Sequence, residues 1–140
     1  TLGLTVIIIT HEMSVVRQVC DSVSLLEAGR IVESGRLEDI VLDVDSRLSR
    51  EIVPFPKVPE AAVAHGESVI DVSITAHPGQ PAAVALMSMV AELGGDIAAG
   101  VFETIGQAQI GRLAVTIPGP DTEQAVSTLR HAGIAAEVRS

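Results

Sequence analysis

The chain has 140 residues, enough for one or two small domains, and a formal net charge of −9 from 9 basic and 18 acidic residues. The basic residues are scattered, which argues against nucleic acid as a partner, because phosphate binding needs clustered Lys and Arg. The one cysteine excludes an intrachain disulfide, and no stretch approaches the roughly 18 apolar residues of a membrane span.

An apolar run at residues 4–9 is followed directly by Thr10-His11-Glu12. The run predicts a buried strand, and the spacing of apolar residues from Glu12 to about Val19 predicts a short helix. In α/β proteins, polar groups at the carboxyl end of a buried strand face the ligand. His11 is therefore a candidate for contacting an anionic oxygen, although the local pattern alone favours a histidine that only hydrogen-bonds near the strand end.

Two short strands are predicted next, residues 23–26 and 30–33, with a tight turn at Ala28-Gly29 between them and an acidic amphipathic helix at 37–44. The N-terminal segment resembles the carboxyl end of an ABC-transporter ATPase domain. The resemblance lies in the order of its elements: apolar strand, T-H-E, short helix, C-D-S-V, E-A-G-R-I-V-E-S-G and acidic helix. The resemblance implies that His11 is the switch histidine, which contacts the γ-phosphate of ATP and orients the attacking water.

Other parts of such an ATPase are missing from the sequence. It has no G-x-x-x-x-G-K-[ST] loop, no apolar run ending in Asp-Glu and no Ser-Gly-Gly signature, and it begins at Thr1. We therefore expect residues 1–52 to be the C-terminal part of an ABC ATPase domain of α/β architecture, which binds ATP and Mg²⁺ only when complete. This chain alone is expected to bind neither and to be inactive, which leaves its status as an enzyme open. No metal site is predicted, since the four histidines lie far apart without ligand spacing.

Three prolines between residues 54 and 59 favour extended backbone, so we predict a linker over 53–67. Beyond it, the apolar pattern changes repeatedly between the periods of strands and helices. Strands are predicted at 70–76, 96–104, 112–117 and 134–138, with helices from Pro81 to Leu93 and from Asp121, which caps it with Gln124, to Ala132.

This β-α-β-β-α-β order predicts an α+β, ferredoxin-like domain over residues 68–140. A domain of about 70 residues with a core of mostly Ala and Val is marginally stable. We therefore expect a homodimer, in which a second copy supplies further apolar burial.

The same residues resemble the NIL domain, an ACT-like regulatory module that follows the ATPase domain in methionine-type ABC importers. The matching segments are S-V-I-D-V-S-I-T, G-Q-P, G-D-I-A-A-G-V-F-E and I-G-R-L-A-V-T-I-P-G. The resemblance implies a domain that binds methionine and inhibits transport when cytoplasmic substrate is plentiful. It also implies a membrane permease as partner and a peripheral location on the inner face of the cell membrane. The amino-acid contacts it suggests are Gly79, Gln80, Asp96 and Ile97.

The sequence departs from the family at the triplet for which the domain is named. Asp96-Ile97-Ala98 stands in place of Asn-Ile-Leu, and an aspartate cannot donate hydrogen bonds as the amide does. Methionine sensing is then weakened, re-tuned or lost, and Asp96 is equally interpretable as a solvated residue that opens a strand. The alternative function is a stand-alone amino-acid-binding or dimerisation module without ATPase activity. A phosphate loop encoded upstream of Thr1 would exclude it.

Overall fold

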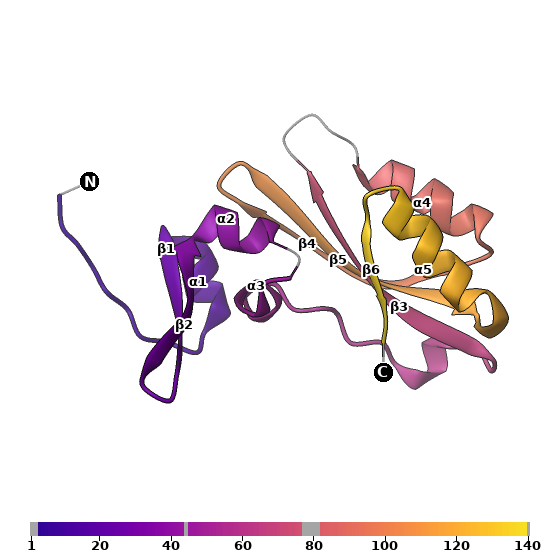
Figure 1. Cartoon of the computed structure of the whole chain (residues 1–140), viewed down its shortest axis with the longest axis horizontal. Helices are drawn as coiled ribbons and strands as arrows, with labels where there is room; N and C mark the ends of the chain where they lie inside the picture. The colour runs from indigo at the N-terminus through magenta and orange to yellow at the C-terminus, as the bar shows by residue number, and fades with distance from the viewer. Residues whose placement is uncertain (1–2, 44, 77–81, 140) are drawn as a thin grey trace.

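A computed structural model describes residues 3–43, 45–76 and 82–139. The chain forms two parts that lie side by side (Figure 1). The N-terminal part contains α1 (Met13–Val19), β1 (Ser22–Glu27), β2 (Arg30–Arg36), α2 (Leu37–Leu42) and α3 (Arg47–Ile52). The C-terminal part contains β3 (Glu67–Ala76), α4 (Ala82–Glu92), β4 (Asp96–Ile105), β5 (Ala108–Pro118), α5 (Thr122–His131) and β6 (Ala135–Val138). None of the helices in the described ranges is long and apolar enough to cross a bilayer.

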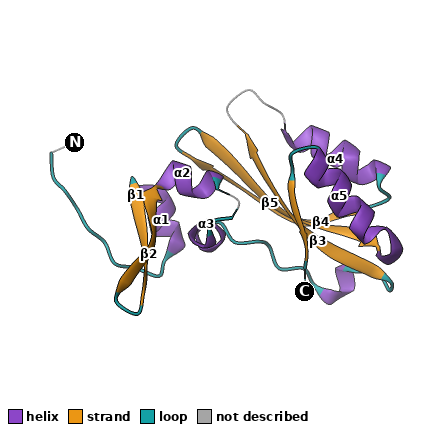
Figure 2. Ribbon diagram, viewed as in Figure 1, coloured by secondary structure: helices purple, strands orange, loops and turns teal. Residues whose placement is uncertain are grey.

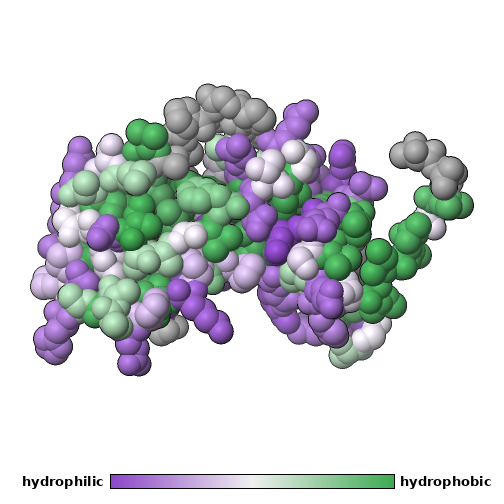
Figure 3. Space-filling view, turned by 180° about the vertical axis from the view of Figure 1, so that it is seen from behind, coloured by the Kyte–Doolittle hydropathy of each residue, from purple (hydrophilic) through white to green (hydrophobic). Residues whose placement is uncertain are grey.

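The buried strand predicted at residues 4–9 is not formed. Residues 4–10 have no regular structure, and the side chains of Leu4, Ile7 and Ile9 are 75%, 86% and 89% exposed. Figure 3 shows these apolar residues as a green segment that stands away from the body of the molecule. A strand needs neighbours to accept its backbone hydrogen bonds, and none of the described strands lies beside this segment.

The hairpin is confirmed and is longer than predicted. β1 and β2 pair antiparallel from Ser22↔Arg36 to Glu27↔Arg30. The two turn residues, Ala28 and Gly29, have φ values of 50° and 76°, the left-handed pair that matches the twist of a two-residue hairpin.

Two short helices follow the hairpin where the sequence predicted one. α2 covers most of the predicted acidic helix and buries Leu37, Ile40 and Val41 on one face. α3 was not predicted. It begins at a good N-cap, since the Ser46 hydroxyl accepts a hydrogen bond of 3.0 Å from the amide of Ser49.

The predicted ferredoxin-like fold is confirmed by the four-stranded sheet. Its strand order is β4-β5-β3-β6 with every pair antiparallel, and α4 and α5 cover one face (Figure 2). The apolar residues of alternate positions on the strands pack against these helices. This helix-side cluster includes Ile70, Val72, Leu86, Val115, Ile117 and Leu129.

The helix ends correct two details of the prediction. Asp121 precedes α5 but its side chain makes no cap hydrogen bond, because its φ and ψ of −97° and 2° are those of a 3₁₀ turn rather than of the extended N-cap. The predicted capping box with Gln124 is therefore absent. Ala132 follows the last helical residue and is exposed instead of facing the core.

The N-terminal part packs on the other face of the sheet at its β4–β5 end. A second apolar cluster combines α2, α3 and Val53 with the β4–β5 end of the sheet, and it includes Val41, Ile52, Val53, Ile105, Ala108 and Ile110. Val53 and Ile110 have no exposed surface. The two parts of the chain thus share one of the two apolar clusters.

Candidate functional site

His11 lies at the junction between the extended N-terminal segment and α1. Its side chain is exposed, and the next residue, Glu12, is the N-cap of α1. The amide of Glu12 donates to the Thr10 hydroxyl at 2.9 Å, which orders the turn into the helix. The imidazole is accessible to a ligand from outside the chain.

Asp96 and Ile97 lie at the start of β4, an edge strand of the sheet. Asp96 is exposed, and its Oδ1 atom accepts a hydrogen bond of 2.8 Å from the amide of Ile97. The side chain of Ile97 is partly buried and packs against the helix-side cluster. Gly79 and Gln80, the other predicted amino-acid contacts, lie outside the described residues.

A β-bulge marks the position of the Asp96-Ile97-Ala98 triplet. The pairing with β5 shifts between Ile97 and Ala99, which leaves Ala98 as the extra residue on the edge strand. Just before the triplet, only a glycine fits at residue 95, because the backbone of β5 passes very close to it. A Cβ atom at Gly95 would lie 2.7 Å from the carbonyl oxygen of Thr116.

The structure does not bring His11 and Asp96 together. α1, which begins beside His11, contacts β4 through Arg17, whose Nε lies 3.7 Å from the Glu103 carboxylate. Asp96 is seven residues before Glu103 on the same strand, roughly 23 Å away at 3.3 Å per residue. The two predicted sites are therefore separate, and any communication between them passes through the contacts between the two parts.

The central contact between the parts is the side chain of Arg112 on β5, which is 1% exposed. Its guanidinium donates to the Val53 carbonyl at 2.9 Å, to the Ser73 hydroxyl at 2.7 Å and to the Ser49 hydroxyl at 2.7 Å. It also lies 5.4 Å from the centre of the Phe55 ring. One side chain of the sheet thus holds α3 and the segment that follows it.

The charge of Arg112 is unusual because no ion pair of this residue is formed within the described ranges. Burial lowers the pKa of Arg112, and the positive charge of Arg50 lowers it further. Neutral oxygens carry the hydrogen bonds that offset the loss of water. Losing any of these hydrogen bonds leaves the charged guanidinium of Arg112 partly unsatisfied.

One further hydrogen bond holds the N-terminal part on the β4–β5 end of the sheet, and another holds its helices together. The Glu38 carboxylate of α2 accepts from the amide of Gln107 at 2.7 Å in the turn between the strands. Arg17 of α1 donates to the Ile52 carbonyl at 2.6 Å, which connects α1 to α3. With the Arg112 contacts and the Arg17–Glu103 pair, the Glu38–Gln107 bond fixes the relative position of the parts.

Comparison with known proteins shows which sequences this chain is similar to. No family model matches the chain. The chain is 37% identical over 139 residues to the "Methionine import ATP-binding protein MetN" of Streptomyces griseus. This alignment covers 98% of the chain and 38% of the relative. Proteins of the same name from Streptomyces avermitilis and Streptomyces coelicolor are each 33% identical over 98% of the chain. The chain is homologous to part of the methionine import ATP-binding proteins.

The match to the methionine import ATP-binding proteins includes both parts of the structure, since it extends over 139 residues. The chain spans about two fifths of the length of these relatives. The single alignment contains the segments of both resemblances seen in the sequence, one in the N-terminal part and one in the C-terminal part.

Neither Arg112 nor Ser49 was predicted from the sequence as a functional residue, although the hydrogen bond between them joins the two parts of the chain. A signal for Arg112 was present. It is the one charged residue in the strand A-Q-I-G-R-L-A-V-T-I-P, and a charge in the middle of a buried strand needs a partner. No comparable signal identified Ser49, because α3 was not predicted.

Proposed function

We propose that this chain is the C-terminal portion of the ATP-binding and ATP-hydrolysing subunit of an ABC importer for methionine. In this proposal, residues 1–52 complete the ATPase domain, and residues 68–140 bind the transported amino acid and inhibit transport. Residues 53–67 link these two domains. The observation that carries it is the similarity to methionine import ATP-binding proteins, which includes both parts of the chain.

The proposed role of His11 is the γ-phosphate switch. Its exposure at the start of α1 is compatible with a nucleotide supplied from outside the chain. The sequence has no phosphate loop, and among the described residues no three His, Cys, Asp or Glu side chains are grouped as a metal site. In the full-length subunit, other residues would hold the nucleotide.

The proposed partners are a second copy of the subunit, a membrane permease and an amino acid, with methionine as the expected ligand. The subunit would lie on the inner face of the cell membrane through the permease. The contacts of Arg112 support a regulatory role for the C-terminal part, because a ligand that moves the sheet also moves α3.

The switch assignment is tested in the full-length subunit by His11→Ala. The variant should keep most of its affinity for ATP and lose most of its ATP turnover, because other residues of the subunit hold the nucleotide while the histidine orients the attacking water. An unchanged turnover rate would refute the assignment.

A further inference from the structure

A half-buried ion pair connects the helix that follows His11 to the C-terminal sheet. The Nε atom of Arg17 on α1 lies 3.7 Å from the Glu103 carboxylate on β4, and the two side chains are 23% and 35% exposed. Glu103 lies opposite Ile110 of β5, and cross-strand partners share a face of a sheet. Because Ile110 belongs to the apolar cluster between the parts, the ion pair lies at the same interface.

A second contact holds the Arg17 side chain in place for this ion pair. Its Nη1 atom donates to the carbonyl of Ile52, the last residue of α3, at 2.6 Å. The preceding residue, Val16, is buried in the apolar cluster between the parts. One side chain of α1 thus contacts α3 and β4 at once.

Helical hydrogen bonds connect Arg17 to the His11 end of α1. The carbonyl of Glu12, the residue after His11, accepts from the amides of Val15 and Val16 at 3.1 and 3.3 Å, and Arg17 follows directly. A helix of seven residues is not stable by itself and depends on its packing contacts for its position. The contacts of Arg17 therefore help to set the orientation of His11.

We propose that Glu103, a residue of the C-terminal sheet, is a positioning residue for ATP hydrolysis. By holding Arg17, it fixes the orientation of α1 and thereby of the His11 imidazole beside the first turn of this helix. Glu103 acts through Arg17 and not on the nucleotide. The inference rests on the proposed switch role of His11. It adds a direct route from the sheet to ATP turnover, because a shift of β4 against α1 separates the ion pair.

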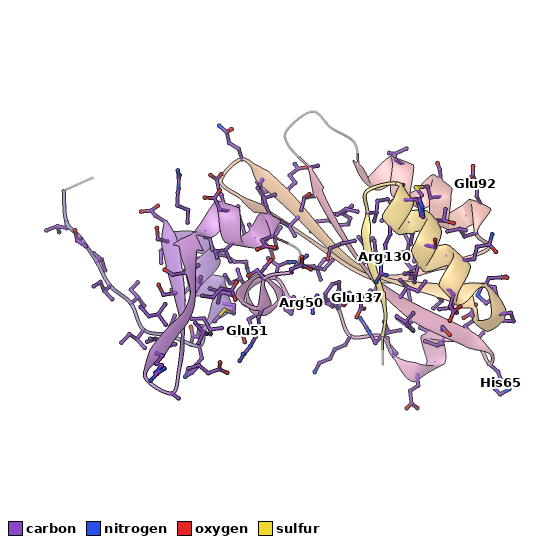
Figure 4. The ribbon with its side chains drawn as sticks, in the orientation of Figure 1. Arg50, Glu51, His65, Glu92, Arg130 and Glu137 are labelled. Atoms are coloured by element: carbon purple, nitrogen blue, oxygen red, sulfur yellow. The ribbon has the colours of Figure 1, made fainter. Side chains whose placement is uncertain are left out.

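A second ion pair between the parts provides a matched control. Arg50 on α3 and Glu137 on β6 lie close together in Figure 4, and the Arg50 Nη2 atom is 3.5 Å from the Glu137 carboxylate. Their side chains are 45% and 61% exposed, and neither residue belongs to α1. Neutralising Glu137 therefore removes the same charge from the sheet as neutralising Glu103, but leaves the contacts of Arg17 in place.

The test is the ATP turnover of the full-length subunit, assembled with its permease. Glu103→Gln should lower kcat by about two- to fivefold, the change that the loss of a half-exposed ion pair can produce. The KM for ATP should stay at the wild-type value, because other residues hold the nucleotide. Glu103→Asp keeps the charge and should retain more of the wild-type kcat than Glu103→Gln. An unchanged or raised kcat in Glu103→Gln would overturn the inference.

The control variant, Glu137→Gln, should have the kcat of the wild type. The thermal unfolding midpoints of Glu103→Gln and Glu137→Gln should both lie close to that of the wild type, because partly exposed ion pairs contribute little to stability. A loss of kcat in Glu137→Gln equal to that in Glu103→Gln would show a general effect of the charge of the sheet, and it would overturn the specific role of Glu103.

His11→Ala distinguishes the failure of this inference from the failure of the switch role. In the His11→Ala background, Glu103→Gln should lower the remaining turnover no further, because its effect passes through His11. An equal fold loss in both backgrounds would overturn the inference and leave the switch role intact. If His11→Ala alone keeps the wild-type turnover, the switch role and the inference fail together.

Discussion

The Nη2 atom of Arg112 lies 2.7 Å from the hydroxyl oxygen of Ser49, although 63 residues separate the two in the chain. Ser49 has no exposed surface and donates in turn to the Val41 carbonyl at 3.2 Å. A buried cation on the sheet is thereby connected to both α3 and α2. This connection is the structural basis for treating the two parts of the chain as coupled.

Replacing Arg112 should destabilise the whole chain. Arg112→Met removes the donor for Val53, Ser49 and Ser73, so buried oxygens lose their partners, and we expect a loss of about 3 kcal/mol in the free energy of unfolding. Arg112→Lys should lose less stability than Arg112→Met because its ammonium group still donates hydrogen bonds, but it should remain below the wild type because it cannot reproduce the planar fork. Denaturant unfolding measures both. An unfolding free energy equal to that of the wild type would contradict the proposed role of this contact.

Ser49→Ala by itself should lower the free energy of unfolding by about 1.5–3 kcal/mol, the range for a hydrogen bond to a charged group. In the Arg112→Met background the same substitution should cost much less, because the partner is already gone. A double-mutant cycle measures the difference. Full additivity would show that the two side chains do not interact.

Gly95→Ala should disturb the turn into β4. The added Cβ would lie 2.7 Å from the Thr116 carbonyl oxygen and in contact with Ile117, and we expect a destabilisation of about 1–3 kcal/mol. Gly100→Ala on the same strand is the matched control, since the nearest atom to its Cβ would be 3.6 Å away. Equal unfolding midpoints for the two variants would count against the close packing at Gly95.

The ion pair between Glu27 and Arg47 should make the stability of the chain slightly dependent on pH. The hydrogen bond and positive charge of Arg47 lower the pKa of Glu27, so the pair stabilises the folded chain above the ordinary pKa of a glutamate and loses this effect as the pH falls through the lowered value. At pH 7, the midpoint of thermal unfolding should be slightly higher in the wild type than in Glu27→Gln. The gap should close below about pH 4 and in high salt. A gap that widens on acidification would contradict the pairing.

The ferredoxin-like fold was predictable because its strands and helices have clear periods of their own. β3, β5 and α4 all have regular apolar spacing, and each pattern specifies an element without reference to distant residues. The predicted strand at residues 4–9 failed for the opposite reason. Its apolar side chains need neighbouring strands, and no described strand provides them.

The contacts between the parts could not be predicted from local patterns. α3 has six residues, too few for a clear helical period, and its position depends on Arg112 from a strand far along the chain. Sites built from distant elements leave little trace in the spacing of any one of them.

In the proposed function, the C-terminal part senses an amino acid and thereby changes the rate of ATP hydrolysis. The most direct test is the ATP turnover of the full-length subunit, assembled with its permease, as L-methionine is titrated on the side of the subunit. We predict that turnover falls as methionine increases, and that Arg112→Met reduces the inhibition. Turnover that stays constant while methionine binds would contradict the claim.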